Sequence, residues 1–71
     1  MLGEKEALVV DVRRLDVHGV GYVDLTVAYR DRSTDSARLG RESVPEDLEK
    51  GERVIVRSAA NMIVAVERPA G

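Results

Sequence analysis

Asp16 and His18 come closest, by type and spacing, to residues that do chemistry. They lie two positions apart on one strand face, so the carboxylate could orient the imidazole as in a hydrolase triad, with Ser33 or Ser36 as nucleophile. Such a nucleophile needs a sharp elbow and a Gly-rich loop with oxyanion donors, and the sequence contains neither. We interpret His18 as a solvated turn residue and expect no catalytic residues and no enzyme activity.

The other titratable groups offer no metal or cofactor site. The chain has no Cys and a single His, which excludes thiolate catalysis, Cys-based metal sites and any site that needs two imidazoles. Five acids crowd the 42–52 segment, but without the alternating oxygen ligands and central Gly of a calcium loop. Such a run of acids is typical of a solvated turn. The five acids are Glu42, Glu46, Asp47, Glu49 and Glu52. We expect no metal and no cofactor.

An arginine-rich hairpin over 30–41 suggests nucleic-acid binding as one function. Four arginines stand there against two aspartates, although the whole chain carries a formal net charge of -2. Proteins that bind single strands combine such basic loops with aromatic side chains on which bases stack. The residues of this alternative site are Tyr22, Arg30, Arg32, Arg38 and Arg41. The near-neutral total charge argues against strong nonspecific attraction to nucleic acid.

The last predicted hairpin carries apolar residues on both faces. If Asn61 closes a three-residue loop in a left-handed conformation, Val64 pairs with Val56 and Val66 with Val54. That register places Ile55, Ile63 and Ala65 on the outer face; a shift by one residue instead places Ile55, Met62 and Val64 there.

Both registers leave an apolar strip outside the core. In one interpretation, closure of the strands into a barrel, or the N-terminal segment, covers the strip. In the other, a protein partner or a second copy covers it. The candidate partner-binding residues are Ile55, Met62, Ile63 and Val64.

The elements that must position these residues are five short strands, because apolar residues alternate with a period of two. The first strand begins with the alternating segment 8–13. The alternation slips near Arg13-Arg14, which predicts a bulge of one extra residue there. The others cover 23–29, a short segment at 37–39, 53–57 and 62–67. Between the third and fourth strands, Ser43 and Glu46 can form a capping box that opens a helical turn, and Gly51 ends it.

The fold class is therefore all-β: a single domain, 1–71, built as a small five-stranded antiparallel barrel. Five strands with one helical turn between the third and fourth are typical of an OB-like barrel, with an SH3-like barrel as the alternative. The expected core residues are Val10, Val12, Val23, Leu25, Val27, Leu39, Val54 and Val56.

Composition places the chain among small globular domains. Its 71 residues are 44% apolar and 34% charged, near the lower size limit for a self-supporting core. No apolar run reaches the length of a membrane span, and no signal-peptide pattern is present. We expect a cytoplasmic chain that does not insert into a membrane.

Three stretches resemble the soluble C-terminal OB-fold domain of the NfeD family. They are the Gly-x-Gly-x-x-Asp-Leu motif at Gly19 to Leu25, the Lys-Gly-x-x-Val-x-Val motif at 50–56, and the strand at 63–68. The sequence departs from that family at 29–32, where Tyr-Arg-Asp-Arg replaces a Pro-x-Gly turn. The resemblance implies an OB barrel that works by protein contact, in that family with stomatin-like membrane proteins, and it implies no catalysis.

The leading hypothesis is a non-catalytic protein-interaction module that binds a protein partner or forms a homo-oligomer through the last hairpin. The alternative is a single-stranded nucleic-acid-binding domain that uses the 30–41 hairpin.

Overall fold

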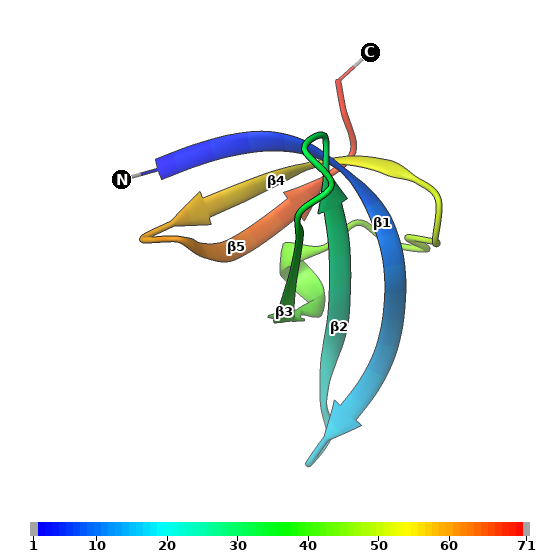
Figure 1. Ribbon diagram of the computed structural model, residues 1–71. Coiled ribbons are helices and arrows are strands. Elements are labelled where there is room, and N and C mark those ends of the chain that lie inside the picture. Colours follow the sequence, from blue (N-terminus) through cyan, green and yellow to red (C-terminus); the bar gives the residue numbers. More distant parts are fainter. Residues whose placement is uncertain (1, 71) are drawn as a thin grey trace.

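The computed structural model describes residues 2–70, which form one five-stranded antiparallel sheet with a short 3-10 turn (Figure 1). The strand order is β3-β2-β1-β4-β5, so β3 and β5 are the two edges. The elements are β1 (Leu2–Val17), β2 (Val20–Tyr29), β3 (Thr34–Gly40), η1 (Arg41–Ser43), β4 (Arg53–Ala59) and β5 (Met62–Glu67). The all-β, antiparallel prediction is confirmed.

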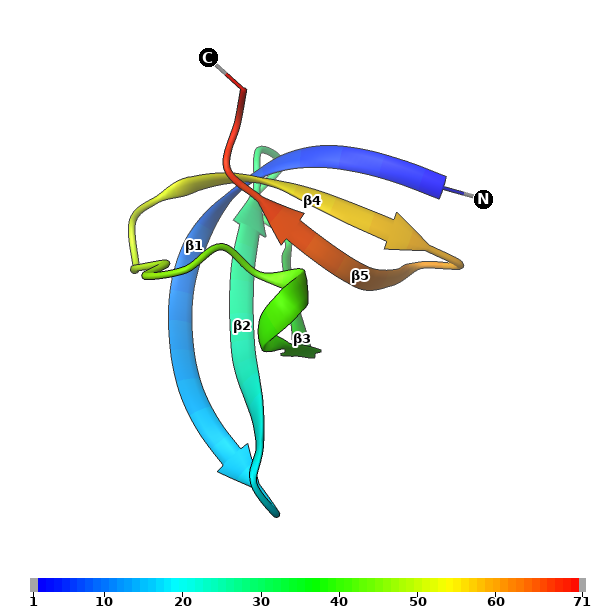
Figure 2. The ribbon, with the colours of Figure 1, turned by 180° about the vertical axis from the view of Figure 1, so that it is seen from behind.

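The sheet is strongly curved, but it does not close into the barrel that the sequence predicts. No backbone ladder joins β3 to β5 within residues 2–70, although the two strands approach each other. The segment from η1 to β4 crosses the inner face of the sheet instead (Figure 2). Its side chains Val44 and Leu48 are buried, Leu48 completely. Apolar side chains of this segment therefore cover the core where the sheet stays open.

Most of the predicted core is confirmed. Six of the eight expected residues are buried, namely Val23, Leu25, Val27, Leu39, Val54 and Val56. Val12 is half-buried against the core, whereas Val10 is 45% exposed, so its placement in the core was wrong. The core also contains residues outside the predicted set: Ala7, Val9, Val44, Leu48, Ile63 and Val66.

The error at Val10 comes from the position of the bulge in β1. The register with β2 shifts between Val9 and Asp11, which makes Val10 the extra residue, several positions before the predicted site at Arg13-Arg14. The Val9 amide donates to the Glu52 carbonyl at 2.9 Å, and the Gly51 amide donates to the Val9 carbonyl at 2.8 Å. These bonds from the segment before β4 hold Val9 at the place where its side chain points into the core.

The predicted short helical turn between the third and fourth strands is confirmed, but its position differs from the prediction. η1 ends at Ser43, the position at which the predicted helix begins, and Val44 is extended at φ -136 and ψ 142. The physical reason is Pro45, because a proline disfavours helical geometry in the residue that precedes it. Among the described residues, Ser43 and Glu46 form no capping box.

Candidate functional site

The outer face of β1, β4 and β5, opposite the core, carries a network of charges around Ile55. Ile55 lies between Glu6 of β1 and Glu67 of β5 in the sheet register. One row away, Arg57 pairs with Glu4 at 3.4 Å and with Glu67 at 3.0 Å. Ile55 is half-buried within this network. The N-terminal half of β1 thus borders Ile55. This matches the interpretation in which the N-terminal segment, and not a partner protein, lies against the apolar strip.

The register of the last hairpin differs from the first predicted register, in which Val64 pairs with Val56 and Val66 with Val54. Val66 lies opposite Val56, and a bulge follows at Val64. The turn has two residues, Ala60 and Asn61, at φ 51 and 65, instead of three. Two central residues with positive φ are typical of the tight hairpin turn that suits twisted strands. Asn61 was correctly predicted to be left-handed, but the shorter loop changes the pairing.

This register separates the four predicted partner-binding residues. Ile63 is 7% exposed and belongs to the core, so its outward placement in the first predicted register was wrong, whereas the second register placed Met62 and Val64 outside as observed. Met62 and Val64 are 69% and 45% exposed. Met62 directly follows the Ala60-Asn61 turn on the edge strand β5. The exposed apolar group that remains is the pair Met62 and Val64 at the end of the β4–β5 hairpin, and we call it the hairpin patch.

The predicted nucleic-acid residues do not converge on one surface. Arg30 and Arg32 lie at the β2–β3 turn, whereas Arg41 follows the far end of β3. At about 3.3 Å per residue, the seven residues of β3 separate these positions by roughly 20 Å. Arg41 lies against β2, where its side chain occupies the space that a Cβ on Gly21 would need. Tyr22 is half-buried beside it.

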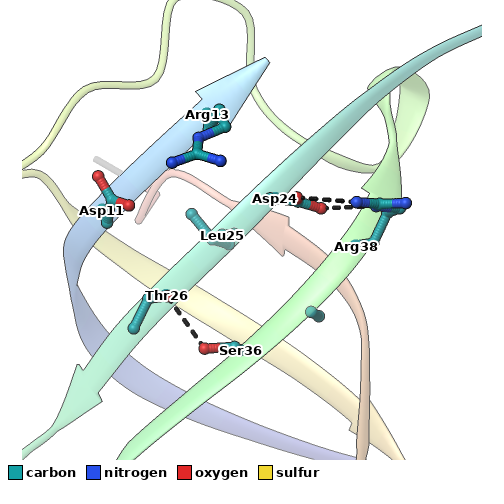
Figure 3. A pocket seen from close by; sticks show the side chains of 8 residues that line it. Asp11, Arg13, Asp24, Leu25, Thr26, Ser36 and Arg38 are labelled. Carbon is teal, nitrogen blue, oxygen red and sulfur yellow. Dashed lines mark hydrogen bonds and ion pairs between the residues drawn. The ribbon is translucent and has the colours of Figure 1, made fainter. Parts of the chain in front are cut away.

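Arg38 lies between these two ends, and a carboxylate neutralises it. Its Nε donates to Asp24 Oδ1 at 2.7 Å and its Nη2 donates to Oδ2 at 3.0 Å (Figure 3). The hydrogen bond from Arg38 lowers the pKa of Asp24 below its usual value, and the same bond raises the pKa of Arg38. A guanidinium held by two bonds to a carboxylate has less positive charge to offer a phosphate.

The second tyrosine is also engaged within the fold. Tyr29 packs against the core, and its hydroxyl donates to Asp35 at 3.4 Å. Partial burial, followed by the nearby Asp35 charge, raises the pKa of Tyr29. Lys5 Nζ lies 5.1 Å from the ring centroid, within the range of a cation–π contact. Tyr29 is therefore not free to stack on a base.

A shallow depression lies on the outer face of β1, β2 and β3 beside this ion pair (Figure 3). Thr26 and Ser36 form a hydrogen bond across it at 3.0 Å, and Asp11 and Arg13 line its β1 side. Among the described side chains, no buried polar atom lacks a hydrogen-bond partner. Four of the lining side chains bond in pairs, Thr26 with Ser36 and Asp24 with Arg38, whereas Asp11 and Arg13 form no ion pair among residues 2–70.

The residues considered for a triad lie far apart. His18 is in the β1–β2 turn at φ 51, and Ser33 is in the turn at the opposite end of β2, where it bonds to Asp31. The ten residues of β2 span roughly 30 Å. Ser36 is closer along the sheet but bonds to Thr26 at 3.0 Å. Asp16, His18 and a serine hydroxyl are thus not brought together.

Comparisons with known proteins give no relative: no family model matches the chain, and neither a curated protein nor a solved structure matches it significantly. In the part of the chain that the structure describes, no three His, Asp or Glu side chains group as metal ligands. Within residues 2–70 there is also no helix with the length and apolar character needed to cross a bilayer.

Proposed function

We propose that this chain is a non-catalytic protein-interaction module and that the hairpin patch, Met62 and Val64, contacts the partner. The observation that carries the proposal is the exposure of these side chains, 69% and 45%, at the end of an edge hairpin. Methionine is flexible and polarisable, which suits it to apolar binding surfaces. Burial of two such side chains is worth roughly 3–6 kcal/mol before association costs, which is enough for a weak or modest complex.

The scaffold of this module is, in our proposal, a partly open barrel of the OB type. The five-stranded antiparallel sheet and the short turn after β3 support it. A barrel would close by pairing the two edge strands β3 and β5, and OB barrels are partly open Greek-key barrels. The resemblance to the soluble NfeD domain supports the same scaffold and the same class of function, binding by protein contact.

Binding of single-stranded nucleic acid is the alternative, and the charges favour it less. Of its four arginines, Arg38 is bound to Asp24, and Arg30 lies 4.0 Å from Glu6. Tyr22, on the outer face near Arg38, favours this alternative, because its ring could supply a stacking surface.

An amide-shift titration separates the two functions. The isotope-labelled chain is mixed with an extract of its host cells, treated beforehand with either nuclease or protease. The proposal expects shifts at Met62 and Val64 that survive nuclease and disappear after protease. Val64→Lys should abolish these shifts, whereas Lys50→Glu, a charge change on an exposed loop, should preserve them. Shifts that disappear after nuclease and map to Tyr22 and Arg38 would overturn the proposal.

A further inference from the structure

The C-terminal half of β1 has a free backbone edge. β1 pairs with β4 only from Leu2 to Leu8, whereas its pairing with β2 continues to Val17. The segment before β4 bonds to Val9, and within residues 2–70 no strand or loop backbone bonds to this edge beyond that point. The β1–β2 hairpin projects past the end of β3, with this part of β1 at its margin (Figure 1). Between Asp11 and Val17, the amides and carbonyls that point away from β2, at alternate residues, are therefore unpaired.

The outer face of this projecting hairpin is apolar toward its tip. In the register, Leu15 lies opposite Tyr22 and Val17 opposite Val20, and side chains two positions apart share a face. Val17 and Val20 are 38% and 52% exposed, and Leu15 is half-buried. Leu15, Val17 and Val20 thus form an apolar stripe on the outer face, next to the free edge.

A cation marks the other end of the stripe. Arg13 is exposed on the same outer face, two positions before Leu15. The residue opposite Arg13 on β2 is Asp24, and both carboxylate oxygens of Asp24 accept hydrogen bonds from Arg38. Arg13 forms no ion pair among residues 2–70. On the outer face, the free edge thus presents, in order, an acid, a cation and two apolar side chains: Asp11, Arg13, Leu15 and Val17.

We infer that this edge binds an extended, acidic–apolar segment of another protein, which adds to the sheet as a strand antiparallel to β1. Backbone bonds from Asp11 to Val17 would provide affinity, and alternate side chains would provide specificity. Read from its N-terminus, the segment places apolar residues beside Val17 and Leu15 and a carboxylate beside Arg13. Opposite charges and apolar pairs on neighbouring strands stabilise such pairing, and like charges oppose it. This surface is separate from the hairpin patch, so either site can fail without the other.

A designed peptide tests the inference with the whole chain. The probe is Thr-Val-Thr-Val-Thr-Glu-Thr with blocked ends, and its matched control replaces the Glu by Lys. The Glu peptide should shift the amides of Asp11 to Val17 and protect alternate ones from hydrogen exchange. The Lys peptide should bind roughly three- to tenfold more weakly. Arg13→Glu should reverse this order of affinities, and Arg32→Glu, the same change at an exposed turn, should not.

The result with Arg13→Glu distinguishes specific recognition of the peptide's Glu side chain from nonspecific adhesion of the peptide. The inference is overturned if neither peptide shifts the β1 edge at about 1 mM, or if both bind equally to the parent. It is also overturned if the shifts map to Met62 and Val64, or if the edge is already protected by self-association of the parent chain. Val64→Lys serves as a further control, because it should leave binding of the Glu peptide unchanged.

Discussion

Arg14 of β1 donates from Nη2 to the backbone carbonyl of Leu48 at 3.0 Å, and the Leu48 side chain is completely buried. The bond attaches the segment between η1 and β4 to the inner face of the long strand. Since β3 and β5 form no ladder, this segment completes the core where the sheet is open. A turn that composition marks as acidic and solvated therefore also has a structural role.

Leu48→Ala should be as damaging as a truncation in the middle of a strand. We predict a loss of roughly 2–5 kcal/mol in the free energy of unfolding, because Leu48 is 0% exposed and nothing behind it can fill the space. Urea unfolding measures the change. Lys50→Ala, on the exposed side of the same segment, should stay within about 0.5 kcal/mol of the parent. Equal stabilities of the parent and Leu48→Ala would show that the segment is not part of the core.

The position of the bulge in β1 has an equally direct consequence for stability. Val9 is 1% exposed and Val10 is 45% exposed. Val9→Ala should therefore cost roughly 1.5–3 kcal/mol, and Val10→Ala should change the stability by less than about 0.5 kcal/mol. Thermal unfolding of the two variants side by side provides the measurement. The opposite order would place the bulge near Arg13-Arg14 after all.

Local alternation predicts the strands of this sheet well, but it does not determine the position of the bulge. In Leu8-Val9-Val10 all three residues are apolar, so either parity satisfies the pattern. The parity is chosen by the hydrogen bonds of Val9 to Gly51 and Glu52, which are more than forty positions away in sequence. Whether the sheet closes into a barrel also depends on long-range contacts, because Leu48 packs into the core where β3 and β5 do not pair.

The ion pair of Asp24 and Arg38 predicts an acid-sensitive contribution to stability. The hydrogen bond from Arg38 lowers the pKa of Asp24 below 3.8, so the unfolded chain binds this proton at a higher pH than the folded one. The stabilisation is fully present above the unfolded pKa and is lost as the pH falls through the lowered, folded value. Urea unfolding between pH 5 and pH 2, a range of about three units around that pKa, should show a shallower decline for Asp24→Asn than for the parent.

Arg38→Met supplies the matching test of the cause. Because it removes the cation and keeps much of the side chain, it should flatten the same part of the pH profile as Asp24→Asn. A parent-like decline in both variants would mean that this ion pair does not couple folding to pH.

The same ion pair makes a prediction about nucleic acid. With Arg38 neutralised, the chain should bind a short single-stranded oligonucleotide no more tightly than about 100 μM, and Asp24→Asn should strengthen binding by freeing the guanidinium. Fluorescence anisotropy at low and moderate salt measures both. Tight binding by the parent, with a steep salt dependence and a loss in Arg38→Ala, would favour the nucleic-acid function instead.

The candidate protein site could be predicted in part. The sequence shows that the last hairpin has too many apolar residues for one face, and Met62 and Val64 are among the residues selected on that basis. It does not reveal that Ala60 adopts a positive φ with Asn61, because alanine has no preference for that conformation. The resulting two-residue turn buries Ile63 and leaves its neighbours exposed.

Site-specific photocross-linking from position 62, in the cells that produce the chain, tests whether the hairpin patch contacts a protein partner. With a photoreactive residue in place of Met62, we predict a discrete protein adduct that is lost when Val64→Lys is added. The same probe at Lys50, an exposed position away from the hairpin patch, should give no such adduct. The adduct mass shows whether the partner is a second copy or another protein. If positions 62 and 50 give the same adducts, or if Val64→Lys changes nothing while the chain stays folded, the hairpin patch is not a protein-binding surface.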